Sequence, residues 1–470
     1  MTSSEDLQLE QELEERRQEL DDPIQPDSDL IYGLEDRPPL PNTLFAALQH
    51  VLASFVGIIT PSFIVAGALG LEPADASAII SMSLFASGIS TFIQAKRIGP
   101  VGSGLLSIQG TSFAFIGPII AAGTAATANG STPAEALGLV FGLCFFGSFI
   151  EMIFSRFIHL AGKIITPIVT GTVVTLIGLT LINVGITSIG GGFPAREAGT
   201  FGSPQNLGLA ALVLIIIVTL NSLNSPLLRM SSIVVGLIVG YVVALPLGLV
   251  NFGALSSASV FSLPLPFQYG FGFSFSLFIP FAFLYLITTI ESVGDLTATS
   301  IVTGQPITGK TYMSRIKGGV LGDGVNSLIA ACFNSFPNTT FSQNNGVIQL
   351  TGIGSRYVGM FIAGLFVLLG LFPIVGSVIQ TVPQPVLGGA TILMFGTVAA
   401  AGIKILSTVN FTKRASLILA VSLGMGLGVT FAPDILDQMP SLVKSIFSSG
   451  ISAGGLSALV LNILLPGSRE

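Results

Sequence analysis

The chain has 470 residues, of which half are hydrophobic and only 9% are charged. Its mean hydropathy is +0.84, whereas about a quarter of the residues in a soluble globular domain are charged. This composition excludes a soluble domain, and the lack of alternating ~10-residue apolar segments excludes a transmembrane β-barrel. We therefore predict an all-α polytopic membrane protein.

The formal net charge of -6 is unevenly distributed along the chain. Residues 1–37 hold 13 acidic and three basic side chains, whereas the remaining residues hold 11 acidic and 15 basic ones. The first segment has too few apolar residues to pack alone, and it lacks the basic and then apolar pattern of a signal peptide. We predict an acidic cytoplasmic tail over residues 1–37.

Apolar stretches of about 20 residues, the length that spans a bilayer, recur from Thr43 to Pro466. We expect 14 spans, seven in each half of the chain. The first seven are centred on 43–69, 76–95, 105–123, 134–157, 164–185, 207–224 and 230–250. The second seven are centred on 275–294, 314–333, 341–353, 357–377, 385–403, 414–432 and 449–466.

The basic residues predict the orientation of these spans. With a cytoplasmic N-terminus, 13 of the 15 basic residues after residue 37 fall in inner loops, and only Arg196 and Lys444 fall in outer loops. This distribution follows the positive-inside rule. An even number of spans then places both termini in the cytoplasm.

Two of the predicted spans are interrupted by small and polar residues. The third contains Gly102–Phe113, and the tenth contains the amide-rich segment Gln343–Gly352, which follows Asn334–Thr340. Each is third in its set of seven. Because seven is an odd number of spans, the second set enters the membrane from the side opposite to the first. Paired broken spans in an inverted repeat indicate a transporter's binding site. Amide side chains both donate and accept hydrogen bonds, which suits a flat heterocycle.

Three residues of the first half are candidates for this site. His50 lies within the first span, where it is either a substrate contact or a packing residue with its hydrogen bonds satisfied. Ser112 and Phe113 stand on the third span. Backbone groups there could hold the edge of a ligand while the Phe113 ring supports its face, although Phe113 could equally contact lipid or core.

Acidic residues within the spans are candidates because an ionisable group at the bilayer centre costs about 2.5–3.5 kcal/mol. Glu291 and Asp295 lie four residues apart, on one helical face. They either accept N–H bonds from a substrate or lie at the inner interface near Lys310 and Arg315.

Two further acids have different surroundings. Asp323 lies among glycines that allow close helix packing, so it is either a proton carrier or a hydrogen-bonded brace between helices. Glu151 lies five residues before Arg156, and we expect the two to pair locally.

The chain contains no motif typical of an enzyme or of a nucleotide-driven pump. Its two histidines are far apart, its two cysteines lie in apolar runs, and it has no glycine-rich phosphate loop. We expect no enzymatic activity, no cofactor, no metal site and no nucleic-acid partner. Transport would then be driven by an ion gradient.

The tenth span resembles the signature of the nucleobase–ascorbate transporter family. The residues that fit the signature are Gln343, Asn344, Gly346, Thr351 and Gly352. The resemblance extends through Leu34–Pro39, Gly102–Gln109 and Gly318–Leu321, and it is closest to the bacterial xanthine permease branch.

The resemblance implies a fold of 14 spans in two inverted seven-span repeats, with short strands in the broken spans 3 and 10. A core domain would comprise 43–160 and 275–378, and a gate domain 163–250 and 380–466. The resemblance also implies a homodimer in the bacterial inner membrane that couples purine uptake to protons.

The resemblance assigns roles to the candidate residues. Glu291 would bind the N–H groups of a purine, and Gln343 would bind its amide edge. Asn344 would support the site, His50 would shape it, and Ser112 would tune the choice of purine.

Proton coupling would involve Asp323, together with Glu291 and Asp295. Gln343, where uracil-type relatives tend to carry glutamate, favours xanthine as the substrate. A uric acid carrier or a broader nucleobase carrier is the alternative within this class. An anion exchanger or channel of the same architecture is a more distant alternative, although such relatives often carry a soluble C-terminal domain and favour a positive site.

Overall fold

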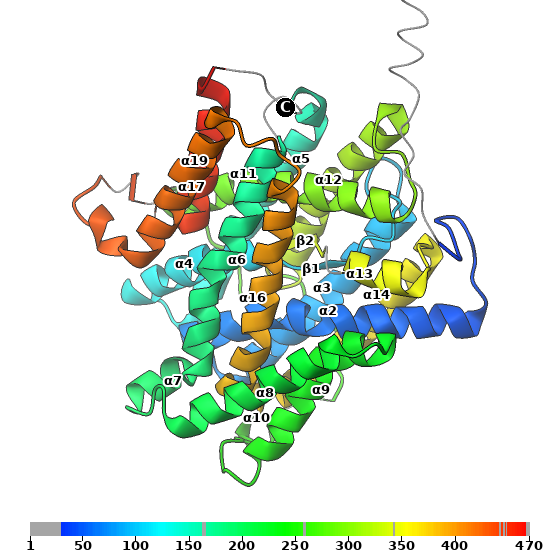
Figure 1. The fold of residues 1–470 in the computed structure, drawn as a ribbon. Helices are drawn as coiled ribbons and strands as arrows, with labels where there is room; N and C mark the ends of the chain where they lie inside the picture. The colour runs from blue at the N-terminus through cyan, green and yellow to red at the C-terminus, as the bar shows by residue number, and fades with distance from the viewer. Residues whose placement is uncertain are drawn as a thin grey trace, which may run out of the picture.

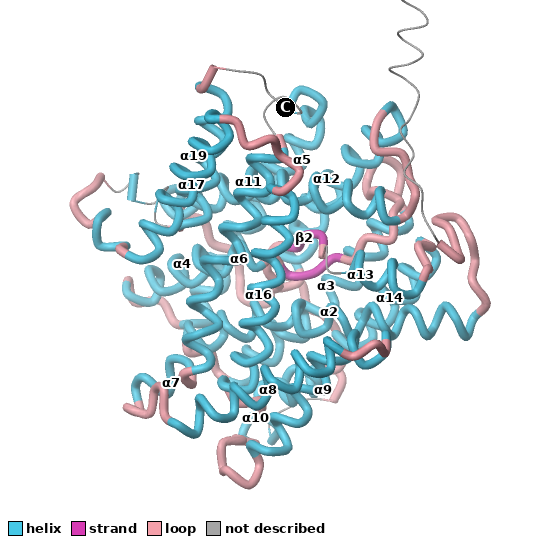
Figure 2. The backbone as a smooth tube through the Cα atoms, in the orientation of Figure 1, coloured by secondary structure: helices cyan, strands magenta, loops and turns pink. Residues whose placement is uncertain are grey.

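The computed structural model describes residues 30–161, 166–256, 260–341, 344–440, 443–444, 447 and 449–466. Most of the predicted acidic tail therefore lies outside the described residues. Figure 1 shows a bundle of helices around two short strands near its centre, and Figure 2 shows how little of the backbone is strand.

The helices of the first half are α2 (Leu40–Leu69), α3 (Pro73–Lys96), α4 (Ile116–Ala128), α5 (Pro133–Ala161), α6 (Pro167–Ile189), α7 (Gly192–Glu197), α8 (Pro204–Ser222), α9 (Pro226–Ala244) and α10 (Gly253–Ser256). Those of the second half are α11 (Phe275–Val302), α12 (Gly309–Cys332), α13 (Asn344–Thr351), α14 (Arg356–Gly370), α15 (Pro373–Gln380), α16 (Gln384–Leu406), α17 (Lys413–Phe431) and α19 (Gly450–Leu464). Several begin at a proline, whose fixed φ angle and missing N–H group suit the first helical position.

Eight of the described helices are long and apolar enough to cross a membrane. A ninth span results if α14 and α15, which are bent by 74° at their junction, count as one. Other predicted spans coincide with the shorter apolar helices Phe113–Ala128, Ser231–Ala244 and Gly450–Leu464. Length and composition therefore give a multi-pass helical membrane protein, and the total of 14 spans stays a prediction.

One short strand lies in the interrupted third span, and a second lies in the Asn334–Thr340 stretch just before the tenth. Strand β1 (Gln109–Thr111) pairs with β2 (Asn338–Thr340) in an antiparallel ladder, with Gln109 opposite Thr340. Two further backbone bonds extend this contact, from Ser112 to the Pro337 carbonyl at 2.8 Å and from Phe341 to the Ile108 carbonyl at 2.9 Å. The strand expected in the tenth span thus ends just before the predicted start at residue 341.

Extended backbone is tolerated inside a helical membrane protein where its polar groups are paired within the protein. Gly102 precedes β1 with a φ of 98°, and a Cβ atom there would lie 2.3 Å from the Ile93 carbonyl oxygen. Its N–H group donates to the Gly318 carbonyl at 2.7 Å. The glycine therefore lets the incoming chain lie directly between α3 and α12.

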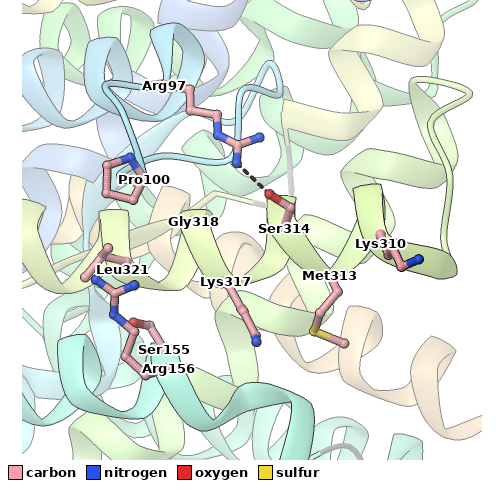
Figure 3. A pocket seen from close by; sticks show the side chains of 10 residues that line it. All are labelled: Arg97, Pro100, Ser155, Arg156, Lys310, Met313, Ser314, Lys317, Gly318 and Leu321. Carbon is pink, nitrogen blue, oxygen red and sulfur yellow. Dashed lines mark hydrogen bonds between the residues drawn. The ribbon is translucent and has the colours of Figure 1, made fainter.

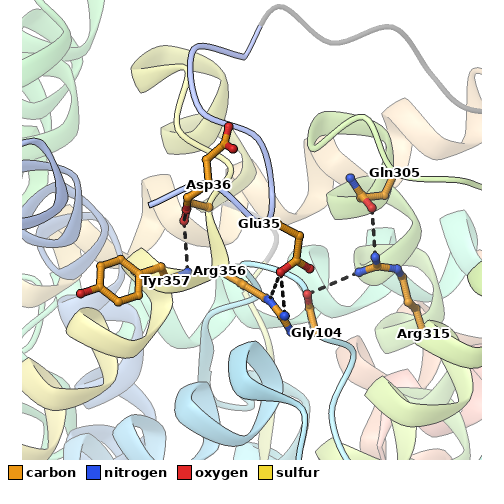
Figure 4. Close-up of polar contacts among 8 residues, drawn as sticks. Glu35, Asp36, Gly104, Gln305, Arg315, Arg356 and Tyr357 are labelled. Atoms are coloured by element: carbon orange, nitrogen blue, oxygen red, sulfur yellow. Dashed lines mark hydrogen bonds and ion pairs between the residues drawn. The ribbon is translucent and has the colours of Figure 1, made fainter. Parts of the chain in front are cut away.

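The N-terminal segment of the described chain is hydrogen-bonded to the junction of α13 and α14. The N–H groups of Ile31 and Tyr32 donate to the Gly352 carbonyl at 2.8 and 3.0 Å. The carboxylate of Glu35 accepts two bonds from the Arg356 guanidinium, the shorter at 2.7 Å, as Figure 4 shows. The Leu34–Pro39 stretch therefore has an anchoring role in the fold.

The helices pack in two sets. In one set, α3 packs on α14, and α5 packs on α12. In the other set, α6 packs on α16, α8 on α9 and α17 on α19. β1 and β2 belong with the first set, since they contact α3 and α12 respectively.

Candidate functional site

A cavity of about 260 Å³ lies beside the strand pair. Its polar lining comes chiefly from α11 and β2, and its apolar lining comes chiefly from α6, α9 and α16. The lining residues are Ala53, Phe113, Val174, Ile177, Asn221, Ser232, Ile233, Glu291, Asp295, Thr339, Thr340, Phe341, Gly346, Val347, Leu393, Met394, Thr397, Val398 and Ala401. Both sets of helices thus contribute to this cavity.

The two carboxylates predicted on one face of a helix both line this cavity. Glu291 lies on α11, and its Oε2 atom is buried without a hydrogen-bond partner among the described residues. One turn further along, Asp295 accepts a hydrogen bond of 3.0 Å from the Thr340 hydroxyl of β2. Because buried acceptors are normally paired, the free oxygen of Glu291 suits a ligand that donates N–H groups.

Phe113 contributes the aromatic surface of the cavity. It begins the short 3₁₀ helix Phe113–Phe115, one residue after β1 ends, and it meets Phe395 of α16 edge to face with ring centroids 5.3 Å apart. Ser112 is buried, and its hydroxyl has no partner among the described residues. Ser112 supports the position of Phe113 through the backbone but is not part of the cavity lining.

His50 and Asn344 lie behind the cavity wall. The amide Nδ2 of Asn344 lies 3.0 Å from Nδ1 of His50, and both side chains are fully or almost fully buried. Because the amide nitrogen only donates, Nδ1 of the imidazole accepts. These two residues therefore join the start of α13 to α2 and do not line the cavity.

Asp323 forms a brace between three helices. Its Oδ1 accepts a 2.6 Å bond from the Gln94 amide of α3, and its Oδ2 accepts from the Ser292 hydroxyl of α11. The Gln94 amide also donates to the Gly319 carbonyl at 2.8 Å, while its oxygen accepts from the Ser103 N–H at 2.8 Å. Asp323 is fully buried. Ser292, which donates to Asp323, directly follows Glu291 on α11.

Gln343 lies outside the described residues, so its predicted contact with a ligand stays a prediction. Its neighbours on α13 are described, and Gly346 and Val347 line the cavity. The described part of the amide-rich segment therefore reaches the cavity through Gly346 and Val347, and its role in binding stays a prediction.

One expectation about a charged residue was wrong. Glu151 does not pair with Arg156: the Glu151 side chain is 1% exposed, whereas Arg156 is exposed. Residues five apart on a helix point about 140° away from each other, so the spacing does not favour a pair.

Several contributors to the site had no signal in the sequence. Gln94 and Ser292 reach Asp323 only through tertiary packing, and the apolar wall from α6, α9 and α16 looks like any membrane helix. Thr340 falls within a polar stretch, which was the one available hint.

A larger hollow of about 410 Å³ lies elsewhere, between α5 and α12 (Figure 3). Its lining residues are Arg97, Pro100, Ser155, Arg156, Lys310, Met313, Ser314, Lys317, Gly318 and Leu321. It offers four cationic side chains but neither a carboxylate nor an aromatic ring. The smaller cavity therefore fits a flat, N–H-bearing ligand better.

Residues 41–435 match the sequence pattern of a permease family. The chain is 51% identical over 444 residues to "Xanthine permease XanP" of Escherichia coli strain K12, which covers 94% of this chain and 96% of the relative. It is 47% identical over 440 residues to "Xanthine permease XanQ" of the same organism, covering 94% of each.

Two solved structures have a similar fold at low sequence identity. The transmembrane domain of the cyanobacterial bicarbonate transporter BicA has a TM-score of 0.53 at 15% identity, covering 89% of this chain and 99% of that one. The inward-facing murine anion transporter Slc26a9 has a TM-score of 0.61 at 13% identity, covering 92% and 69%. These likenesses show the fold alone.

Proposed function

Because this chain belongs to the nucleobase–ascorbate transporter family, we propose that it takes up an oxidised purine, xanthine, together with protons. The chain is a nucleobase transporter and not an enzyme. The names of the relatives support xanthine as the substrate. The observation that carries the proposal is the unpartnered oxygen of Glu291, which lines a cavity beside the β1–β2 pair.

In the proposed complex, the purine lies flat against Phe113. The Glu291 carboxylate accepts N–H bonds from the ring, and Gln343 binds the amide edge of the ring. Asn344 and His50 hold the start of α13 in place through their 3.0 Å contact. Ser112 tunes the choice of purine through the backbone that carries Phe113.

Proton coupling is assigned to Asp323, Glu291 and Asp295. Asp323 is the buried brace, and Ser292, which donates to it, follows Glu291 directly on α11. A change of protonation at Asp323 would therefore act on the helix that holds the purine. One proton crossing 100 mV supplies about 2.3 kcal/mol, which is enough for a roughly 50-fold substrate gradient.

We also propose the finer architecture of 14 spans in two inverted repeats. β1 with α4 forms the third span, and β2 with α13 forms the tenth. The α3–α14 contact (spans 2 and 11) then corresponds to the α12–α5 contact (spans 9 and 4), and α8–α9 corresponds to α17–α19. If the two halves are repeats, each helix contact must recur between the helices seven spans away, as these contacts do.

The same two packing sets support the two proposed domains. The core domain is 43–160 with 275–378, and the gate domain is 163–250 with 380–466. The cavity is lined by both, so a movement of the core against the gate would open it to alternate sides. We place both termini in the cytoplasm, with the protein in the bacterial inner membrane as a homodimer.

The test is uptake of a panel of nucleobases by purified protein in liposomes with an imposed proton gradient. We expect gradient-dependent xanthine uptake that is abolished in Glu291→Gln, with the variant still folded. Glu135→Gln is the matched control, because Glu135 is exposed and bonds locally to the Thr132 N–H at 2.8 Å. Normal uptake by Glu291→Gln would refute this site.

Competition separates the alternatives within the class. Unlabelled xanthine should compete best, and equal competition by uric acid, hypoxanthine or uracil would indicate a broader carrier. Substrate-independent anion currents would instead indicate an exchanger or channel of the same fold.

A further inference from the structure

A buried carboxyl group lies on the helix seam next to the Asp323 brace. Glu151 of α5 is 1% exposed, and its Oε1 atom is buried with no hydrogen-bond partner among the described residues. An orphaned acidic oxygen in a hydrocarbon-depth seam is costly, so a role other than packing is expected.

The packing of α5 on α12 brings Glu151 near Asp323. Gly324 lies so close to α5 that a Cβ atom there would be 2.7 Å from the Met152 side chain and 3.1 Å from the Ser148 carbonyl. Glu151 and Asp323 each directly precede one of these contacting residues, and Ser148, one turn before Glu151, also meets α12.

The same seam leads outward to the basic hollow shown in Figure 3. Ser155 lies one helical turn beyond Glu151 and is 1% exposed, and it lines the hollow together with Leu321 and Gly318 of α12. We call this hollow the basic vestibule, after Arg97, Arg156, Lys310 and Lys317. Ser148 and Ser155, about one turn to either side of Glu151, thus both lie against α12, which places Glu151 on the same face of α5, between Gly324 and the vestibule.

We propose that Glu151 relays the coupled proton from Asp323 to the basic vestibule, by a route separate from the purine cavity. This inference rests on the proposed proton symport. Asp323 gives up its proton and becomes a carboxylate, while the Glu151 carboxylate gains that proton. Glu151 then releases it to water in the vestibule and returns to the carboxylate form.

The charges around Glu151 favour this direction of transfer. α5 packs on α12, which carries Asp323, and on α11, which carries Glu291 and Tyr285. These acids favour proton capture by Glu151. The four cations of the vestibule favour release, because a positive potential disfavours a bound proton. Under the proposed topology the vestibule opens to the cytoplasm.

The test compares net uptake with exchange in the same liposomes. Purine exchange at equal pH needs no proton release, whereas net uptake does. For Glu151→Gln we expect uptake driven by a pH gradient to fall at least tenfold, with exchange and xanthine affinity within twofold of the native protein. Glu151→Asp, which keeps an acid, should restore part of the net uptake, and Glu135→Gln should behave as native.

A pH dye trapped in the liposomes provides the second measurement. Native protein should acidify the interior as xanthine enters, and Glu151→Gln should not. If Glu151→Gln takes up xanthine and acidifies the interior as native does, the relay is refuted. Equal loss of exchange and net uptake in both Glu151 variants would also refute it in favour of a structural role. If the native protein itself carries no protons, the proposed symport fails instead.

Discussion

The side-chain amide of Asn344 lies 3.0 Å from the imidazole Nδ1 of His50, although the residues are 294 positions apart. The contact joins the first residue of α13 to α2, and both side chains are buried. The Nε2 atom of His50 and the Oδ1 atom of Asn344 have no partner among the described residues. The pair therefore links these two helices through buried polar atoms.

Replacing Asn344 by Ala should weaken both folding and binding. The change leaves a second buried ring nitrogen of His50 unpaired, which costs about 1–3 kcal/mol. It also frees the start of α13, so the KM for xanthine should rise at least fivefold. Thermal unfolding in detergent and liposome uptake measure the two effects. Asn129→Ala, at an exposed position, is the control, and an unchanged KM in Asn344→Ala would contradict the anchoring role.

Replacing Gly110 by Ala should disturb the strand pair. A Cβ atom at Gly110 of β1 would lie 2.4–2.8 Å from three atoms of the Phe341 ring, which is itself part of the cavity wall. Overpacking of this kind costs about 1–3 kcal/mol. We expect a lower unfolding temperature and at least tenfold slower uptake.

Gly117→Ala is the matched control for this change. Gly117 lies seven residues further on, at the start of α4, and a Cβ atom there would meet nothing within 4 Å. This variant should transport as native does, or gain slight stability because alanine favours a helix. If the two variants behave alike, tight packing at the strand crossing is not required for transport.

Replacing Phe113 by Ala should lower purine affinity more than it lowers stability. The ring is 9% exposed and lines the cavity, so its loss removes the surface on which the purine is proposed to lie and one edge-to-face contact with Phe395. Such contacts contribute about 0.5–1.5 kcal/mol beyond area burial. We expect the KM to rise about tenfold in the uptake assay.

Phe146→Ala is the comparison for Phe113→Ala. Phe146 lies on α5 and is exposed, with its ring against Phe271 and Phe273. Its loss should leave the KM unchanged. Equal KM values for the native protein, Phe113→Ala and Phe146→Ala would show that the purine does not need the aromatic ring of Phe113.

The sequence predicted the elements of this fold better than their contacts. The first span was predicted at 43–69 and is α2 (Leu40–Leu69), because a long apolar run is a local property. The polar character of Gly102–Phe113 likewise indicated where a helix would be interrupted. The prediction of an interruption within Gln343–Gly352 was wrong for its described part, because Asn344–Thr351 forms α13 and the extended backbone lies just before it. Family resemblance supplied the short strands, and the structure places β2 just before the predicted tenth span.

Long-range partners could not be predicted in the same way. Gln94 lies 229 residues from Asp323, and only the close approach of α3 and α12 brings them together. Glu151 was wrongly paired with Arg156, because sequence proximity was given more importance than helical direction. The apolar wall of the cavity could not be predicted, because the sequence does not distinguish an apolar side chain that faces a ligand from one that faces lipid.

The ion pair between Glu35 and Arg356 should contribute little to stability despite its short distance of 2.7 Å (Figure 4). The two side chains are 66% and 35% exposed, and ion pairs at such sites contribute about 0–1 kcal/mol. The backbone bonds of the segment, such as that from the Arg356 N–H to the Leu34 carbonyl at 3.0 Å, do not depend on this pair. A double-mutant cycle of Glu35→Gln and Arg356→Gln should therefore give a coupling energy below about 1 kcal/mol that shrinks with added salt.

The exposed Lys444–Asp437 pair, at 2.6 Å, serves as the reference cycle. A coupling above about 2 kcal/mol, insensitive to salt, would show instead that the pair is what holds the N-terminal segment beside the tenth span.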